Sequence, residues 1–499
     1  MPGNIVHITD PETVRSLFGI YPATITYSGT EVVNNKVCKV YEAEYAGEVP
    51  TVCPRCGQKL YSHGYRMMQV ADTPNGGKPV LIKLAMPRRR CRNPDCHYMW
   101  QASYEDITAD RKLTKRAEHA IIEQCIRNTF EEVSRNYPLT STSIVNIFTD
   151  FFRSHPEVLH FKIPEYMGID EIKVNGDFIT VITDLEHHTM FNLLEKRTQP
   201  FLEVYFANLP LAERQRVKWV CSDMYRPFSR PISTYLPNAR WAIDHFHVVM
   251  KANGAVDSIR RKLQSKYPGK TGPHFKHGPA AALRRRLPDL TADDAAGIRW
   301  LRSDPDLSPL ATAYDLKEDF FNIYDENTTS KEDAEAAFTA WENSLPPEPE
   351  KDENGNPVSE DLFKPFRDLA ATVHNFYEEI FAVWDCDIAI SNGFSECSNR
   401  LIRETHLKGR GYSFERLRAK TLLRNANVEA ILENDSAFDY VGPALSENNL
   451  SNLVFSGTGN DGYDLTNDAY PDLGTSEDAP DYDPETGEVL SLNDNEETF

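Results

Sequence analysis

Several features that define whole classes of protein are missing from this sequence of 499 residues. It has no run of about 18 apolar residues, the usual minimum for a helix that crosses a membrane. Residues 1–7 have neither the basic start nor the apolar stretch of a secretory signal. The nine cysteines are an odd number, scattered over a large chain, and do not suggest a disulfide framework. We therefore expect a protein of the reducing cytoplasm with no membrane partner.

Basic residues are missing from the last part of the chain. Residues 441–499 contain fourteen Asp or Glu and no Lys or Arg, so they account for two thirds of the formal charge of −21. Residues 251–286, in contrast, contain ten Lys or Arg against one acid, Asp257. Salt screens charges beyond about 10 Å, so local patches rather than the total decide whether a phosphate backbone is attracted. The acidic total therefore does not exclude DNA.

Four of the cysteines form two close pairs, Cys53 with Cys56 and Cys91 with Cys96. A Zn²⁺ ion takes four soft ligands in a tetrahedron, and a tight turn aims both thiolates of a pair at one point. We therefore predict one structural Zn²⁺ ion held by these four cysteines. The alternative is that they are free, buried thiols.

Residues 105–155 predict three helices, at 115–127, 130–137 and 141–152. In the third, Ile144, Phe148 and Phe152 fall on one face at helical spacing, which leaves Asn146 on the other face. This pattern is typical of a helix-turn-helix whose last helix enters the major groove of DNA. A helical connector without DNA contact fits the pattern equally well.

The residues between 161 and 250 predict a mixed α/β sheet. Runs typical of strands occur at 167–173, 177–184, 189–195, 217–221 and 240–243, with helical stretches at 200–209 and 227–235. Three consecutive strands followed by strand–helix alternation favour this fold class. From about 251 to 372 the sequence is helical and charged, which indicates an insertion into the sheet domain.

Three carboxylates stand out because of where they lie in this pattern. Asp170 closes an apolar run, Asp223 follows another, and Glu396 lies at the start of a later predicted helix. Carboxylates at strand ends are typical ligands of Mg²⁺. If the three meet, they can hold a pair of such ions, the arrangement that supports phosphodiester chemistry.

Around these acids the sequence resembles the DDE transposases of bacterial insertion sequences, specifically the ISL3 family with its N-terminal zinc-binding domain. The resemblance covers roughly residues 50–425 and rests on stretches in matching order: Gly168–Glu171, Ser222–Met224, Asp244–Val249 and Ser391–Glu396. It implies a ribonuclease H-like core in which a helical insertion separates the second Asp from the Glu. Cys397 departs from the family pattern, where Gly is common at this position.

The resemblance also implies functions for individual residues. Asp170, Asp223 and Glu396 would bind two Mg²⁺ (or Mn²⁺) ions, and Asp244 and His247 would support them. The implied partner is double-stranded DNA, both the terminal inverted repeats and the target, with self-association of the protein on DNA. The implied reaction is strand cleavage followed by strand transfer from a 3′-OH, at the nucleoid in a bacterial cytoplasm.

Basic and polar side chains in several segments are predicted to contact DNA. Arginines at the end of a strand, in the basic segment and beside Glu396 would bind phosphates, which positions DNA without reading its sequence. For Arg400 and Arg403, the two arginines beside Glu396, the alternative is that they form a solvated helix face without DNA contact. The residues are Arg88, Arg89, Arg90, Asn146, Arg260, Arg261, Arg284, Arg285, Arg400 and Arg403.

The predicted organisation has six parts: a β-rich lead-in with the zinc module (1–104), a helix-turn-helix segment (105–160), the first part of the core (161–250), the helical insertion (251–372), the second part of the core (373–433) and an acidic, disordered tail (434–499). Two other readings remain open. The chain could be a catalytically inactive, zinc-containing DNA-binding regulator, or a nuclease that shares the ribonuclease H-like core.

Overall fold

The computed structural model describes residues 7–108, 110–155, 162–271, 278–324, 328–350 and 359–424. The chain divides into two compact units, at residues 161/162 and 401/402. The first unit combines the N-terminal part with the segment that begins at Ile402, and the second contains Lys162–Leu401. None of the described helices combines the length and apolar character that a membrane span requires. The predicted acidic tail lies outside the described residues.

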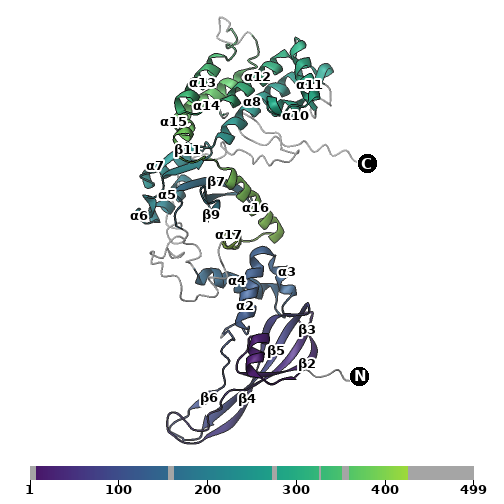
Figure 1. Cartoon of the computed structure of the whole chain (residues 1–499), viewed down its shortest axis with the longest axis vertical. Coiled ribbons are helices and arrows are strands. Elements are labelled where there is room, and N and C mark those ends of the chain that lie inside the picture. The colour runs from purple at the N-terminus through teal and green to yellow at the C-terminus, as the bar shows by residue number, and fades with distance from the viewer. Residues whose placement is uncertain are drawn as a thin grey trace. The chain divides into compact units, whose positions relative to one another are not determined.

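A six-stranded mixed sheet forms the centre of the first unit (Figure 1). Its order is β1-β2-β3-β5-β4, and β6 pairs with the end of β5. Strands β3 and β5 are parallel, and the other pairs are antiparallel. Helix α1 (Pro11–Phe18) buries Val14 and Phe18 against this sheet. The strands are β1 (His7–Ile8), β2 (Ala23–Val33), β3 (Lys36–Tyr45), β4 (Leu60–Asn75), β5 (Lys78–Cys91) and β6 (Met99–Gln101).

Three helices follow this sheet, each begun by a threonine whose side chain accepts a backbone N–H. They are α2 (Lys115–Arg127), α3 (Phe130–Arg135) and α4 (Ser141–Ser154), close to the three predicted helices. Helix α17 (Phe414–Leu423) packs against α2 and α4. Its buried Lys420 donates to the carbonyl groups of Cys125 and Asn128, which the end of α2 leaves without helical partners. The segment after Ile402, assigned to the core by sequence, therefore belongs to the first unit.

The second unit contains a five-stranded sheet in the order β11-β10-β7-β8-β9. Strands β7, β8 and β9 are antiparallel neighbours along the chain, whereas β10 and β11 run parallel to β7. Their bounds agree closely with the predicted strands: β7 (Tyr166–Val174), β8 (Asp177–Asp184), β9 (Thr189–Leu194), β10 (Trp219–Ser222) and β11 (Arg240–Ile243). Helices α5 (Gln199–Asn208), α6 (Leu211–Arg214) and α7 (Ser229–Tyr235) connect β9, β10 and β11.

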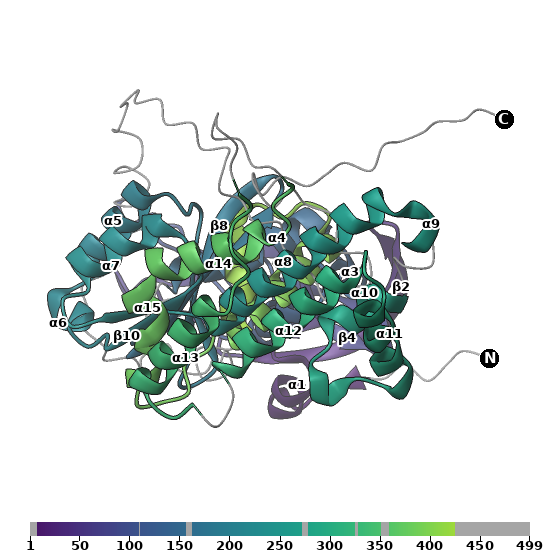
Figure 2. The same cartoon turned by 90° about the horizontal axis from the view of Figure 1, so that it is seen from above.

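A helical region separates β11 from α16, of which the residues up to Leu401 belong to this unit. Its long helix α8 packs against α12 and α14, and these helices lie side by side in both views (Figures 1 and 2). The buried side chains of this region form one apolar core, which explains how the insertion folds without strands. The helices are α8 (His245–Lys266), α9 (Pro268–Thr271), α10 (Gly278–Arg284), α11 (Ala292–Ser303), α12 (Ser308–Asn322), α13 (Lys331–Asn343), α14 (Lys364–Asn375), α15 (Tyr377–Phe381) and α16 (Gly393–Gly409).

Candidate active site and zinc module

Strand register places three aspartates in one row at the edge of the second sheet. Ser222 of β10 pairs with Ile169 of β7 on one side and with Ile243 of β11 on the other. The residue that follows each of these three positions is an aspartate: Asp170 in the middle of β7, and Asp223 and Asp244 directly after β10 and β11. Neighbouring strands lie about 4.8 Å apart, so Asp223 is next to both of the other two. Strand pairing alone thus places Asp223 beside Asp170, which is 53 positions earlier in the sequence, and beside Asp244.

Helix α16 adds Glu396 to this row. The backbone N–H of Asn392 donates to Asp244 Oδ2 over 3.1 Å, and its side-chain amide donates to the Ile169 carbonyl over 3.2 Å. The N–H of Glu396 in turn donates to the Asn392 carbonyl over 3.0 Å. Asn392 therefore fixes the first turn of α16 beside the middle of β7 and the end of β11, which directs Glu396 toward the aspartates.

Asp170, Asp223 and Glu396 hold protons more tightly than carboxyl groups in water. Burial raises the pKa of Asp170 to about 6, and burial with the charges of Asp244 and Asp170 raises the pKa of Glu396 to about 7. Burial, then the charges of Glu171 and Asp170, raise the pKa of Asp223 well above its usual range. Buried acids that repel one another are costly unless a cation compensates them.

Unpartnered buried atoms test whether a cation fits here. Asp223 Oδ1, Glu171 Oε2 and His247 Nε2 are buried without a hydrogen-bond partner. Such atoms are rare in folded proteins and call for a physical explanation, such as an ion. Carboxylate oxygens with one imidazole nitrogen form a donor set that divalent cations accept. The residues present therefore fit a divalent metal site.

Two residues near the acids were not identified from the sequence. Asn399 is buried one turn after Glu396, and its amide donates to Asp170 Oδ2 over 2.8 Å. Arg197 forms an ion pair with Glu171, beside Asp170. The spacing of Asn399 from Glu396 puts both on one face of α16, which is the sequence signal that was available. Asn399 therefore orients Asp170 from the helix that carries Glu396.

Replacing this amide should weaken metal binding without removing a ligand. We expect Asn399→Ala to raise the Mg²⁺ concentration for half-maximal DNA cleavage about 10-fold, since partners that orient metal ligands typically contribute 10- to 100-fold. Ser398→Ala removes a neighbouring buried side chain and serves as the control. An unchanged Mg²⁺ requirement in Asn399→Ala would show that Asp170 does not need this hydrogen bond.

Two groups of metal-ligating side chains occur among the described residues. One contains Asp244, His247 and Glu396, whose donor atoms lie within 4.8 Å of one another. The predicted ligands Asp170 and Asp223 lie outside this group, although their charges act on its members. The structure thus gives the predicted supporting residues, Asp244 and His247, a position directly beside Glu396.

The other group contains the four predicted zinc ligands. Cys53 Sγ lies 3.6 Å from Cys96 Sγ, and Cys56 Sγ lies 3.6 Å from Cys91 Sγ. All four sulfur atoms lie within 4.8 Å of one another. A tetrahedral Zn²⁺ ion with bonds of about 2.3 Å would separate its sulfurs by about 3.8 Å. The cluster therefore fits a zinc ion, and four protein ligands leave no position for catalysis.

Local backbone structure explains how each cysteine pair is aimed. Gly57 has a φ of +72°, and its N–H donates to the Cys53 carbonyl, which closes the turn before β4. The N–H of Gln58 hydrogen-bonds to the Cys56 thiol and lowers its pKa to about 7, whereas burial and the neighbouring thiols raise the pKa of Cys96 to about 12. The second turn joins β5 to β6 through hydrogen bonds from Cys91 and Cys96.

Comparison with known proteins identifies the family of this chain. The model of a transposase family matches residues 167–421, about half of the chain and the region that contains all the acids of the sheet edge. The chain belongs to the ISL3 family of DDE transposases. A second model, of the zinc-finger of the transposases of IS204, IS1001, IS1096 and IS1165, matches residues 50–96, which contain the four cysteines.

One curated member of the ISL3 family is a distant relative. The transposase for insertion sequence element IS1001 of Bordetella parapertussis is 24% identical over 219 residues. The matched region is 42% of this chain and 52% of that protein. The chain therefore spans about half the length of the curated relative that it matches.

The arginines predicted to contact DNA differ in their surroundings in this ISL3 chain. Arg260 is buried, and it donates to Asp257 over 2.7 Å and to Gln264 over 2.8 Å. Arg261 pairs with the same Asp257, and Arg285 pairs with Asp294. The sequence predicted that these arginines carry the basic charge of the segment, but it did not predict the aspartates with which they pair. Burial argues against phosphate contact by Arg260, which instead stabilises α8.

Other predicted contacts remain accessible. Arg90 at the end of β5, Asn146 on α4, Arg284 at the end of α10 and Arg400 on α16 are exposed. The remaining predicted arginines, Arg88, Arg89 and Arg403, are half-buried. Exposure is required for a phosphate contact but does not establish one.

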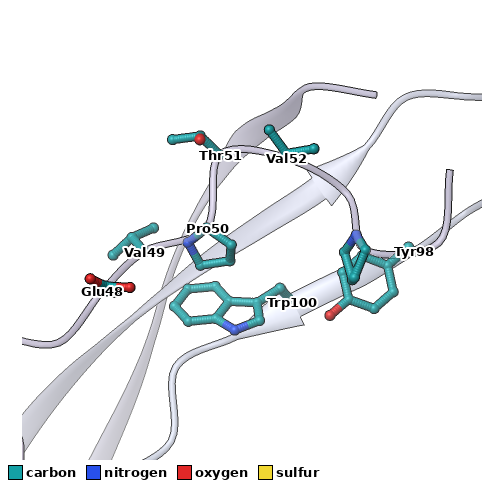
Figure 3. Close-up of a pocket in the computed structure, with 8 residues that line it drawn as sticks. Glu48, Val49, Pro50, Thr51, Val52, Tyr98 and Trp100 are labelled. Atoms are coloured by element: carbon teal, nitrogen blue, oxygen red, sulfur yellow. The ribbon is translucent and has the colours of Figure 1, made fainter. Parts of the chain in front are cut away.

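An open groove lies beside the four-cysteine group of this chain. Pro50 lies over the ring of Trp100, and Tyr98 lines the other end (Figure 3). The only charged side chain among its lining residues is Glu48. A carboxylate repels phosphate, so the groove itself is not a phosphate site.

Proposed function

We propose that this protein is the transposase of an insertion sequence, which cleaves the element's DNA ends and joins their 3′-OH groups to target DNA. The observation that supports the proposal is the alignment of Asp170 and Asp223 on neighbouring strands, with Glu396 near enough to Asp170 for the charge of Asp170 to raise its pKa. The strand order β11-β10-β7-β8-β9 supports a ribonuclease H-like core, as the family implies. The proposed setting is the nucleoid of a bacterial cytoplasm.

The acids would hold two Mg²⁺ ions, with Asp170 between the two positions, Asp223 at one and Glu396 at the other. Bound there, the ions activate the attacking oxygen and stabilise the leaving oxygen at phosphorus. Asp170 suits the shared position because its charge acts on both Asp223, which follows β10, and Glu396 of α16. Asn399 keeps the Asp170 carboxylate in the orientation that ion binding needs.

DNA would be bound by residues of both units. We propose that the zinc module with Arg88, Arg89 and Arg90 and the face of α4 with Asn146 bind the terminal inverted repeats. Arg261, Arg284 and Arg285 would contact flanking phosphates, and Arg400 and Arg403 would hold the strand near the cut. Two protomers on paired ends would supply the self-association that joining of both ends requires.

A strand-transfer assay tests the proposal against its alternatives. Purified protein, Mg²⁺ and pre-cut duplexes that end in the element's own 3′-OH should yield joined products with a supercoiled target plasmid. A nuclease that shares the core would cut the plasmid but leave the duplex unjoined. A DNA-binding regulator would shift the duplex in a gel and produce neither cut nor joined DNA.

A further inference from the structure

The geometry points to a divalent cation site formed by Asp244, His247 and Glu396, so that the second metal position of the active site includes an imidazole nitrogen. This inference rests on the proposed function and deepens it, because Glu396 is shared with the acid triad. Asp244 and His247 would then be metal ligands themselves rather than supports for other ligands. The cation would be one that accepts nitrogen as well as oxygen, such as Mn²⁺.

The first turn of α8 holds two of the three donors in fixed positions. Asp244 caps this helix and is fully buried, and His247 follows three positions later, so both side chains lie on one side. Asp244 Oδ1 accepts the N–H of Phe246 over 3.2 Å, and Oδ2 accepts the N–H of Asn392 over 3.1 Å. Oδ1 also lies 3.5 Å from His245 Nδ1, whereas Oδ2 keeps a second lone pair for a cation.

The third donor comes from the helix that is hydrogen-bonded to Asp244. Glu396 lies in the first turn of α16, four residues after Asn392. The donor atoms of Asp244, His247 and Glu396 lie within 4.8 Å of one another, a separation that a single ion with bonds of about 2.0–2.3 Å can bridge after small side-chain rotations. His247 Nε2 is buried and has no hydrogen-bond partner. A bound cation that accepts its lone pair would explain this.

The charges of the surroundings also favour a cation. The N-termini of α8 and α16 each contribute a partial charge of about +0.5, and these positive charges repel a metal ion. The two carboxylates carry about twice the charge of the two helix ends together, so the site as a whole is negative. Asp170 adds to this field, since its charge acts on Glu396.

Pulsed electron paramagnetic resonance of bound Mn²⁺ tests the site directly. Tag-free, zinc-loaded full-length protein is saturated with Mn²⁺, and ¹⁴N modulation from a directly bonded imidazole is recorded. We expect the parent protein to bind two Mn²⁺ ions and to show this modulation. His247→Gln should lose the modulation and bind its second Mn²⁺ at least about 10-fold more weakly, whereas Asp223→Asn should weaken the other ion and keep the modulation.

Controls separate this site from a folding defect and from the proposed function. His374→Gln changes a histidine of α14 that pairs with Glu342, and it should leave both the modulation and the two ions unchanged. Thermal unfolding of His247→Gln should match that of the parent protein. Absence of modulation in the parent, or its persistence in His247→Gln, would overturn the inference even if the protein joins DNA. Modulation in a protein that joins no DNA would instead support the site and contradict the transposase.

Discussion

Asp170→Asn is expected to lower the rates of DNA cleavage and strand transfer about 10³-fold or more, while binding of the element's end stays within about twofold. A loss of 10³-fold corresponds to about 4 kcal/mol of barrier. The reason is that Asp170 would contact both of the proposed ions, and an amide cannot supply the negative charge that either ion needs. Single-turnover assays on end-containing duplexes and gel-shift titrations measure the two quantities separately.

Asp184→Asn is the matched control for this variant. Asp184 lies on β8 opposite Met167 of β7, and it accepts N–H groups from Glu186 and His187 in the next turn. The asparagine oxygen can accept the same hydrogen bonds, so cleavage should remain within about twofold of the parent. Equal losses in both variants would indicate a general disturbance of the sheet, and an active Asp170→Asn would contradict the metal role of Asp170.

Removal of the zinc ligands is expected to unfold the end of the β4–β5 hairpin. In Cys56→Ser combined with Cys91→Ser, the zinc content should fall from one ion per chain to none. Leu60 is the only residue other than cysteine in the buried cluster at this point, so too little apolar surface remains to hold the turns. Structural zinc in small modules contributes an apparent 10–16 kcal/mol, roughly, to folding. Hydrogen exchange of residues 53–60 and 91–99 measures the loss.

The rest of the protein should keep its structure in this double variant. Exchange in β7, β8 and β10 of the second unit should be unchanged, and non-specific cleavage by that unit should persist while binding of the element's end is lost. Cys386→Ser, in a cysteine outside the cluster, should retain its zinc. Full protection of residues 53–60 without zinc would show that the turns fold without the ion.

Local sequence patterns predicted the elements of the second sheet well. The strand Asp177–Asp184 and the strand Arg240–Ile243 have the bounds expected from their apolar runs and turn residues. The helix Lys115–Arg127 also agrees, because a threonine cap and an apolar face mark it locally. What the sequence could not predict is which unit a helix joins: α17 was assigned to the core, but buried Lys420 and Leu417 place it in the first unit.

The candidate site was predictable in its residue types but not in its geometry. Resemblance pointed to Asp170, Asp223 and Glu396, and the register of β7 with β10 makes the first two neighbours. The approach of His247 to Glu396 depends on two hydrogen bonds from Asn392, which link residues more than 140 positions apart in the chain. Arg260 shows the same limit, since composition reveals its charge but not its buried position or its partner Asp257.

The measurement that tests the central claim most directly is anomalous diffraction from crystals of the protein with Mn²⁺ and an uncleaved DNA end. The account predicts two Mn²⁺ peaks about 3.5–4 Å apart, with Asp170 bonded to both, Asp223 to one and Glu396 to the other. Peaks that leave Asp170 uncoordinated, or an ordered DNA end with no Mn²⁺ at these residues, would contradict it.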